Sequence, residues 1–197
     1  RMLVKEIIDA ENNSTILDYD DNGKLRLITD AEDAETEYQY DGYGRLEKVI
    51  YADTSYEEYG YDAASNITSF QNRANETIAF GYDALNRLEW KQRPNDPNIL
   101  LTYDIGGRLV GVAQDTEQMS FAYDRLGRLE RTVDQNGYEV GYEHDVMGRR
   151  EKLEYPDGSF ITYEYDNIGR LQYIKDQNGY KIVEYVYDSL SRTTNVL

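Results

Sequence analysis

The dipeptide Tyr-Asp returns along this chain at a nearly fixed spacing, and this period constrains the fold more than any other feature. Successive copies are 20 to 22 residues apart. A fixed period of this length indicates a repeat architecture, in which each copy forms one supersecondary unit. The Tyr of each copy stands at Tyr19, Tyr40, Tyr61, Tyr82, Tyr103, Tyr123, Tyr165 and Tyr187, and His144 takes the same place in one further copy.

Other residue types recur at fixed positions, which we count from the Tyr as position 0. Position 1 is always Asp, position 4 is usually Gly or Asn, and position 6 is mostly Leu. Position 5 is basic in eight of the nine copies, with Asn66 as the exception. We therefore predict these structural repeat residues: Tyr40, Asp41, Gly44, Arg45, Leu46, Tyr82, Asp83, Arg87, Tyr123, Asp124, Gly127, Arg128, Leu129, Tyr165, Asp166, Gly169, Arg170 and Leu171.

Each repeat has the pattern of a β-hairpin. Positions −4, −2 and 0 are apolar or aromatic, which is the period-two alternation of a half-buried strand. The Asp-x-x-Gly segment that follows predicts a type I turn closed by a Gly bulge, with Asp at position 1 opposite Arg at position 5. A second turn follows each Leu strand, for example at Asp134 and Asp176. Nine copies imply about eighteen short antiparallel strands, so we expect an all-β hairpin array with Tyr and Leu on one face.

One spacing departs from simple alternation. The apolar position after Leu is position 9, as at Val49 and Val112, which lies three residues beyond Leu46 and Leu109 and not two. The strand must change face between these positions, through a bulge or a bend. A bend in every repeat predicts a curved strip or spiral.

Composition excludes several classes of partner. The 197 residues carry a net charge of −17, which disfavours nucleic acid and anionic membrane surfaces. There is no Cys, and no apolar run long enough to insert into a membrane. We expect one repeat array over residues 1–197. No leader is visible, and the last copy ends inside its motif, so we expect a piece of a longer protein.

The segments "YDGYGRLEKV", "YDRLGRLERTVDQNG" and "YDNIGRLQYIKDQNG" resemble the YD repeats of the RHS family. That family includes bacterial RHS proteins, the B and C components of Tc toxins, and teneurins. The resemblance covers about residues 17–192. It implies a strip coiled into a hollow shell that encloses a toxin or effector domain, or that supports interactions at the cell surface. The implied partners are flanking repeats and an enclosed C-terminal domain of the parent protein, and the implied location is secreted or at the cell surface.

The resemblance carries no catalytic residues onto this chain. The Asp-Pro-x-Gly-Leu motif and self-cleavage site of the RHS core do not occur in the sequence. His144, the single histidine, stands where other copies have Tyr, so we interpret it as a packing substitute and not as a catalytic or metal-binding group. We expect no catalytic site, no cofactor and no metal.

The sequence leaves two binding alternatives open. The segment "DYDDNG", residues 18–23, matches the start of a calcium loop, but Thr29 stands where a bidentate Glu is expected. Rows of exposed Tyr would suit a carbohydrate-binding or adhesion module, which we keep as the second candidate function. A shell segment is distinguished from a sugar binder by whether the repeated aromatic residues pack between strands or lie exposed in grooves.

Overall fold

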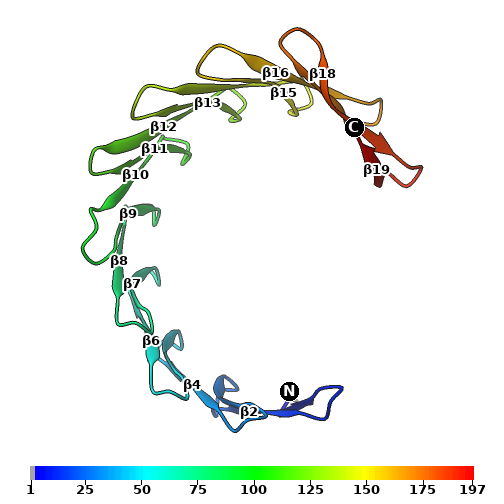
Figure 1. Cartoon of the computed structure of the whole chain (residues 1–197). Helices are drawn as coiled ribbons and strands as arrows, with labels where there is room; N and C mark the ends of the chain where they lie inside the picture. The colour runs from blue at the N-terminus through cyan, green and yellow to red at the C-terminus, as the bar shows by residue number, and fades with distance from the viewer. Residues whose placement is uncertain (1–2) are drawn as a thin grey trace. The chain divides into compact units, whose positions relative to one another are not determined.

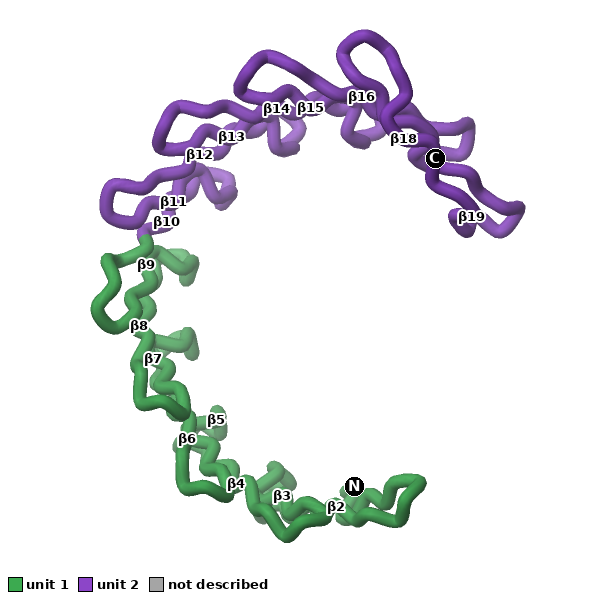
Figure 2. Tube along the Cα trace, in the orientation of Figure 1, with its two compact units in different colours: residues 1–99 green, residues 100–197 purple. Residues whose placement is uncertain are grey.

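The computed structural model describes residues 3–197, and these residues form 19 β-strands and no helix. Local contacts divide the chain into two units, Arg1–Ile99 and Leu100–Leu197 (Figure 2). An all-β hairpin array is confirmed, with one strand more than the repeat count implied. That residues 1–197 act as a single array stays a prediction.

The first unit contains nine complete strands. Each strand pairs antiparallel with the strand that follows it, so neighbours in the sequence are neighbours in the sheet (Figure 1). The strands are β1 (Glu6–Ile8), β2 (Ser14–Tyr19), β3 (Leu25–Thr29), β4 (Glu35–Tyr40), β5 (Leu46–Ile50), β6 (Tyr56–Tyr61), β7 (Ile67–Gln71), β8 (Thr77–Tyr82) and β9 (Leu88–Gln92).

The second unit repeats this order. From β11 to β19 every strand again pairs antiparallel with the next. After β10 (Ile99–Tyr103), which begins at the boundary, come β11 (Leu109–Gln114), β12 (Glu117–Tyr123), β13 (Leu129–Asp134), β14 (Glu139–His144), β15 (Arg150–Glu154), β16 (Phe160–Tyr165), β17 (Leu171–Asp176), β18 (Lys181–Tyr187) and β19 (Thr193–Val196).

The Asp turns have the predicted geometry. In the turn that joins β12 to β13, the N–H of Asp124 donates to the carbonyl of Arg128, and the N–H of Gly127 donates to the carbonyl of Asp124. Gly127 has a φ of 82°, in the left-handed region that the bulge requires. Several of the second turns use the same geometry, for example the turn of residues 51–55, where Thr54 takes a φ of 67°, which is strained for a β-branched side chain.

The change of face inside each repeat is a β-bulge. Tyr123 pairs with Leu129, but Ala122 pairs with Arg131, so Glu130 is an extra residue without a partner in the register. Because the bulge lies directly after Leu, the next residue on the Leu side is three positions further on. The predicted bulge is confirmed. We call the side that carries Tyr123, Leu129 and their equivalents the Tyr face.

Each unit is a single layer of strands without a globular core. Val49, at 5% exposure, is the one hydrophobic residue among residues 3–197 that is buried. The chain exposes 13,792 Å² of surface, whereas a compact monomer of 22.9 kDa would expose roughly 9,600 Å². Stability must therefore come from contacts between neighbouring strands and turns.

Candidate functional site

The repeated Asp organises the turn that follows it. In the turn of residues 124–128, Oδ1 of Asp124 accepts the N–H groups of Leu126 at 2.8 Å and of Arg128 at 2.9 Å. Its Oδ2 accepts Nε of Arg128 at 2.6 Å. The backbone N–H of Arg128, together with its guanidinium, lowers the pKa of the Asp124 carboxyl, although desolvation opposes this. The Asp124 carboxylate, when it is ionised, therefore accepts three hydrogen bonds and fixes the conformation of the turn.

The Tyr hydroxyl joins each repeat to the one before it. Tyr61 donates its hydroxyl to the carbonyl of Leu46 at 2.7 Å, fifteen residues upstream. This bond crosses from the last residue of one strand to the first residue of the second strand of the preceding repeat. We call it the tyrosine staple. It recurs between Tyr19 and Val4, Tyr40 and Leu25, Tyr82 and Ile67, Tyr123 and Leu109, Tyr165 and Arg150, and Tyr187 and Leu171, at distances of 2.6 to 2.9 Å.

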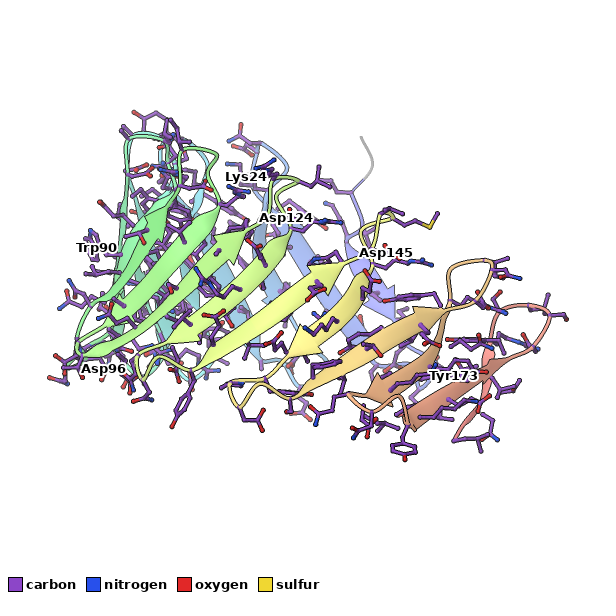
Figure 3. All side chains as sticks on the ribbon, turned by 90° about the horizontal axis from the view of Figure 1, so that it is seen from above. Lys24, Trp90, Asp96, Asp124, Asp145 and Tyr173 are labelled. Carbon is purple, nitrogen blue, oxygen red and sulfur yellow. The ribbon has the colours of Figure 1, made fainter. Side chains whose placement is uncertain are left out.

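The basic side chain at position 5 reaches forward to the next repeat. Arg45 pairs with Asp41 of its own turn, and its Nη1 donates to the carbonyl of Asp62 and to Oγ of Ser65, both at 3.0 Å. The same guanidinium lies 4.4 Å from the ring centroid of Tyr61. Arg128 likewise donates to the carbonyl of Asp145 at 2.9 Å. Asp124 and Asp145 lie at the same end of neighbouring hairpins (Figure 3), so the arginines connect the turns along that edge.

Comparison with known proteins identifies this repeated unit. The family model described as teneurin YD-shell matches residues 1–197. The chain belongs to the teneurin YD-shell family.

Solved structures share the fold of this YD-shell segment. A crystal structure of TcdB2-TccC3 superimposes with a TM-score of 0.62 at 17% identity, covering 98% of this chain and 13% of that one. The TcdB2-TccC3-Cdc42 crystal structure gives the same TM-score and identity, with 97% and 13% coverage. The Tc holotoxin pore of Photorhabdus luminescens gives 0.57 at 13% identity, with 98% and 14% coverage. The segment thus spans about one eighth of those toxin chains. A search of curated protein sequences finds no significant match.

Each type of predicted repeat residue has a defined role in the structure of the YD-shell segment. The Tyr residues form the staples, the Asp residues accept the turn donors, and the Arg residues pair with those Asp residues. Arg45, Arg128 and Arg170 also reach the next turn. Gly44, Gly127 and Gly169 adopt φ values of 81°, 82° and 88°. The carbonyls of Leu46 and Leu171 accept staples. The staple and the forward reach of Arg were not predicted from the sequence, since both end on backbone carbonyls.

The copy that begins at His144 is different. An imidazole cannot donate to the Leu129 carbonyl in the way that a Tyr hydroxyl does, so the segment has no tyrosine staple at this repeat. His144 is half-buried and pairs in the sheet register with Arg150, which stands where other copies have Leu. The described part of the chain holds no group of three His, Cys, Asp or Glu residues placed to bind a metal.

The suspected calcium loop is an ordinary turn. Asp18 is ion-paired with Arg26. Oδ1 of Asp20 accepts the N–H groups of Asn22 and Lys24, at 2.9 and 2.8 Å. These carboxylates are thus occupied by donors of the chain itself. No helix within residues 3–197 is long and apolar enough to cross a membrane.

The two edges of the strip differ in polarity. At the edge formed by the Asp turns, exposed apolar side chains stand at the tips. From Asp83 onward, the Asp at position 1 of every copy is ion-paired with the Arg of its own turn. At the other edge, Asp134 and Asp176 accept backbone N–H groups but pair with no basic side chain of the described chain. The exposed tip residues are Tyr43, Leu85, Leu126, Met147, Ile168 and Leu190.

Proposed function

We propose that this YD-shell segment is a stretch of wall in a larger hollow shell that encloses a protein segment, and that it has no catalytic activity of its own. The tyrosine staple carries the proposal. Each staple uses the Tyr that eight of the nine copies carry to hold one hairpin to the previous one, so the recurring residues are consumed in wall contacts. A catalytic or binding site would leave such polar groups free for a ligand.

The partners follow from the edges of the strip. We propose that the apolar tips of the Asp turns contact other parts of the parent protein, such as flanking repeats. Leu126 is 76% exposed and Ile168 is 70% exposed, and solvent is an unfavourable environment for a recurring row of such side chains. The ion pairs beside them leave this edge with little net charge, so another strip can approach without strong repulsion.

The family supports a location outside the cytoplasm. Teneurin YD-shell is the matching family, and the structures with this fold come from toxin complexes. We propose that the parent protein is secreted or presented at a cell surface, and that its cargo or partner is a protein and not a nucleic acid.

Small-angle scattering and tyrosine nitration test the wall proposal. A wall segment without a globular core should have a radius of gyration clearly above the roughly 16 Å of a compact domain of this length. Nitration should modify Tyr43, which is 90% exposed, well before the staple residues Tyr61 and Tyr82. A compact particle whose position 0 tyrosines are nitrated as fast as Tyr43 would contradict a wall role and favour the carbohydrate-binding module.

In the full-length parent, limited proteolysis tests enclosure. A segment that the shell encloses should resist protease in the intact protein and be degraded when the whole stretch of wall formed by residues 1–197 is deleted. Equal degradation in both forms would contradict enclosure while leaving the wall fold itself intact.

A further inference from the structure

The repeat that begins at His144 departs from the other copies at two positions that face each other. His144 on β14 pairs in register with Arg150 on β15. In the repeat before it the same pair is Tyr123 with Leu129, and in the repeat after it Tyr165 with Leu171. Directly paired residues project from the same side of an antiparallel sheet. The two substitutions therefore place an imidazole and a guanidinium side by side on the Tyr face.

Two tyrosine rings hold the guanidinium in place. The Cζ atom of Arg150 lies 5.2 Å from the ring centroid of Tyr142 and 5.7 Å from that of Tyr163. Its backbone carbonyl still accepts the hydroxyl of Tyr165 at 2.7 Å, so the staple of the next repeat is kept. The rings orient the cation by cation–π attraction and shield part of its surface from water.

Arg150 has no carboxylate within ion-pair distance among residues 3–197, and its side chain is exposed. Several carboxylates of β14 to β16 are paired with other cations, and Glu151, the residue after Arg150, forms no ion pair with it. These pairs are Arg149 with Asp145, Lys152 with Glu143 and Glu154, and Lys175 with Glu164, at 2.6 to 3.2 Å. A guanidinium that is positioned by two rings but left without a counter-ion is an anion-binding group.

No other copy in this unit places a charge at the Leu position. Leu109, Leu129 and Leu171 occupy it in the neighbouring repeats, and Thr193 in the last. A site that departs from the consensus of its own repeat is where a function is expected to interrupt a structural pattern.

We propose that Arg150, between Tyr142 and Tyr163 and opposite His144, binds the carboxylate of a ligand that carries an aromatic or apolar group beside it. The planar guanidinium fork matches a carboxylate in two parallel hydrogen bonds. The tyrosine rings provide apolar walls for the neighbouring group of the ligand. A net charge of −17 opposes the approach of multiply charged anions, which favours a single carboxylate over a phosphate.

An NMR titration of the intact chain tests this site. The probe is N-acetylphenylalanine, which has one carboxylate and one ring, and the matched neutral probe is N-acetylphenylalaninamide. We expect the acid to shift the Arg150 Nε–Hε resonance saturably, and the amide to bind at least about tenfold more weakly, because it lacks the charge-assisted pair. Inorganic phosphate should also bind more weakly than the acid. Equal response to the amide, or a stronger response to phosphate, would overturn the proposal.

Two substitutions complete the test. Arg150→Leu installs the residue that other copies carry, so the chain should stay folded and lose binding, as followed by the Tyr142 and Tyr163 ring resonances. Arg150→Lys keeps the charge but not the fork and should bind several-fold more weakly. Arg125→Leu removes an exposed turn arginine of the same unit and should leave binding unchanged. Binding that survives Arg150→Leu, or that is lost equally in Arg125→Leu, would show that Arg150 is not the anchor.

Discussion

The substitution Tyr61→Phe isolates one tyrosine staple. It removes the hydroxyl that donates to the Leu46 carbonyl at 2.7 Å but keeps the ring. The contact between the ring and the Arg45 guanidinium, 4.4 Å from the centroid, is kept as well. A hydrogen bond of this kind contributes a net ~0.5–1.5 kcal/mol. We therefore expect Tyr61→Phe to lower the free energy of unfolding by about 1 kcal/mol.

Urea unfolding followed by the fluorescence of Trp90, which lies in the same unit, measures this change. With a denaturant dependence of about 1–3 kcal/mol per molar urea, a loss of about 1 kcal/mol lowers the midpoint by roughly 0.3–1 M. Tyr43→Phe is the matched control, because its ring is 90% exposed and its hydroxyl has no partner within the described residues. Equal midpoints for Tyr61→Phe and Tyr43→Phe would refute the view that the staple stabilises the strip.

The opposite substitution, His144→Tyr, should add a staple. Its new hydroxyl would reach the Leu129 carbonyl, as Tyr123 reaches Leu109. Because Trp90 lies in the other unit, unfolding is followed here by circular dichroism, and the urea midpoint should rise by an amount similar to the loss in Tyr61→Phe. A fall in the midpoint would mean that His144 makes a stabilising contact of its own.

Three further perturbations test the turns and the sheet. Thr54 has a φ of 67°, so Thr54→Asn should raise the free energy of unfolding by about 1 kcal/mol, and an unchanged urea midpoint would count against strain there. In Gly81→Ala the new Cβ would lie 1.9 Å from Nε1 of Trp90, so the indole must move. We expect red-shifted Trp90 emission and a free energy of unfolding lower by about 1–3 kcal/mol. Unchanged emission would contradict the close packing of Gly81 against Trp90. The N–H and guanidinium of Arg87 lower the pKa of Asp83 in the folded chain. Ionised Asp83 therefore stabilises the folded chain at pH values above the pKa of Asp in the unfolded chain, and this stabilisation is lost as the pH falls through the pKa of Asp83 in the folded chain. The urea midpoint should stay constant from pH 7 to about 5 and fall below about pH 4. A constant midpoint down to about pH 3 would exclude this contribution of Asp83.

The sequence predicted the features of this fold that depend on local chemistry. The turn type follows from Asp124 and Gly127 because both act within five residues. The bulge at Glu130 follows from the spacing of the apolar residues. Positions 6 and 9 are three residues apart, and a regular strand would place them on opposite faces. The repeat spacing also identified His144 as a substitute for Tyr, because it shows that His144 stands at position 0.

The contacts between repeats were not predicted, because their acceptors are backbone carbonyls that carry no sequence signal. One indication was available. Phe occurs two residues before position 0, as at Phe80 and Phe121, but it never occurs at position 0 itself. Eight copies carry Tyr at position 0 and none carries Phe, which indicates that the hydroxyl is used there. The surroundings of Arg150 were not predicted, because a change from Leu in one copy does not show which rings the new side chain contacts.

The tyrosine staple joins a repeat only to the one directly before it, and the forward arginine only to the one directly after it. If one whole copy of about 21 residues is duplicated or deleted, each remaining hydroxyl again finds a carbonyl and each guanidinium again finds a turn. Gene duplication within such a chain can therefore lengthen or shorten the wall without creating an unsatisfied donor. The capacity of a shell built in this way can evolve in steps of one repeat, independently of the sequence of what it holds.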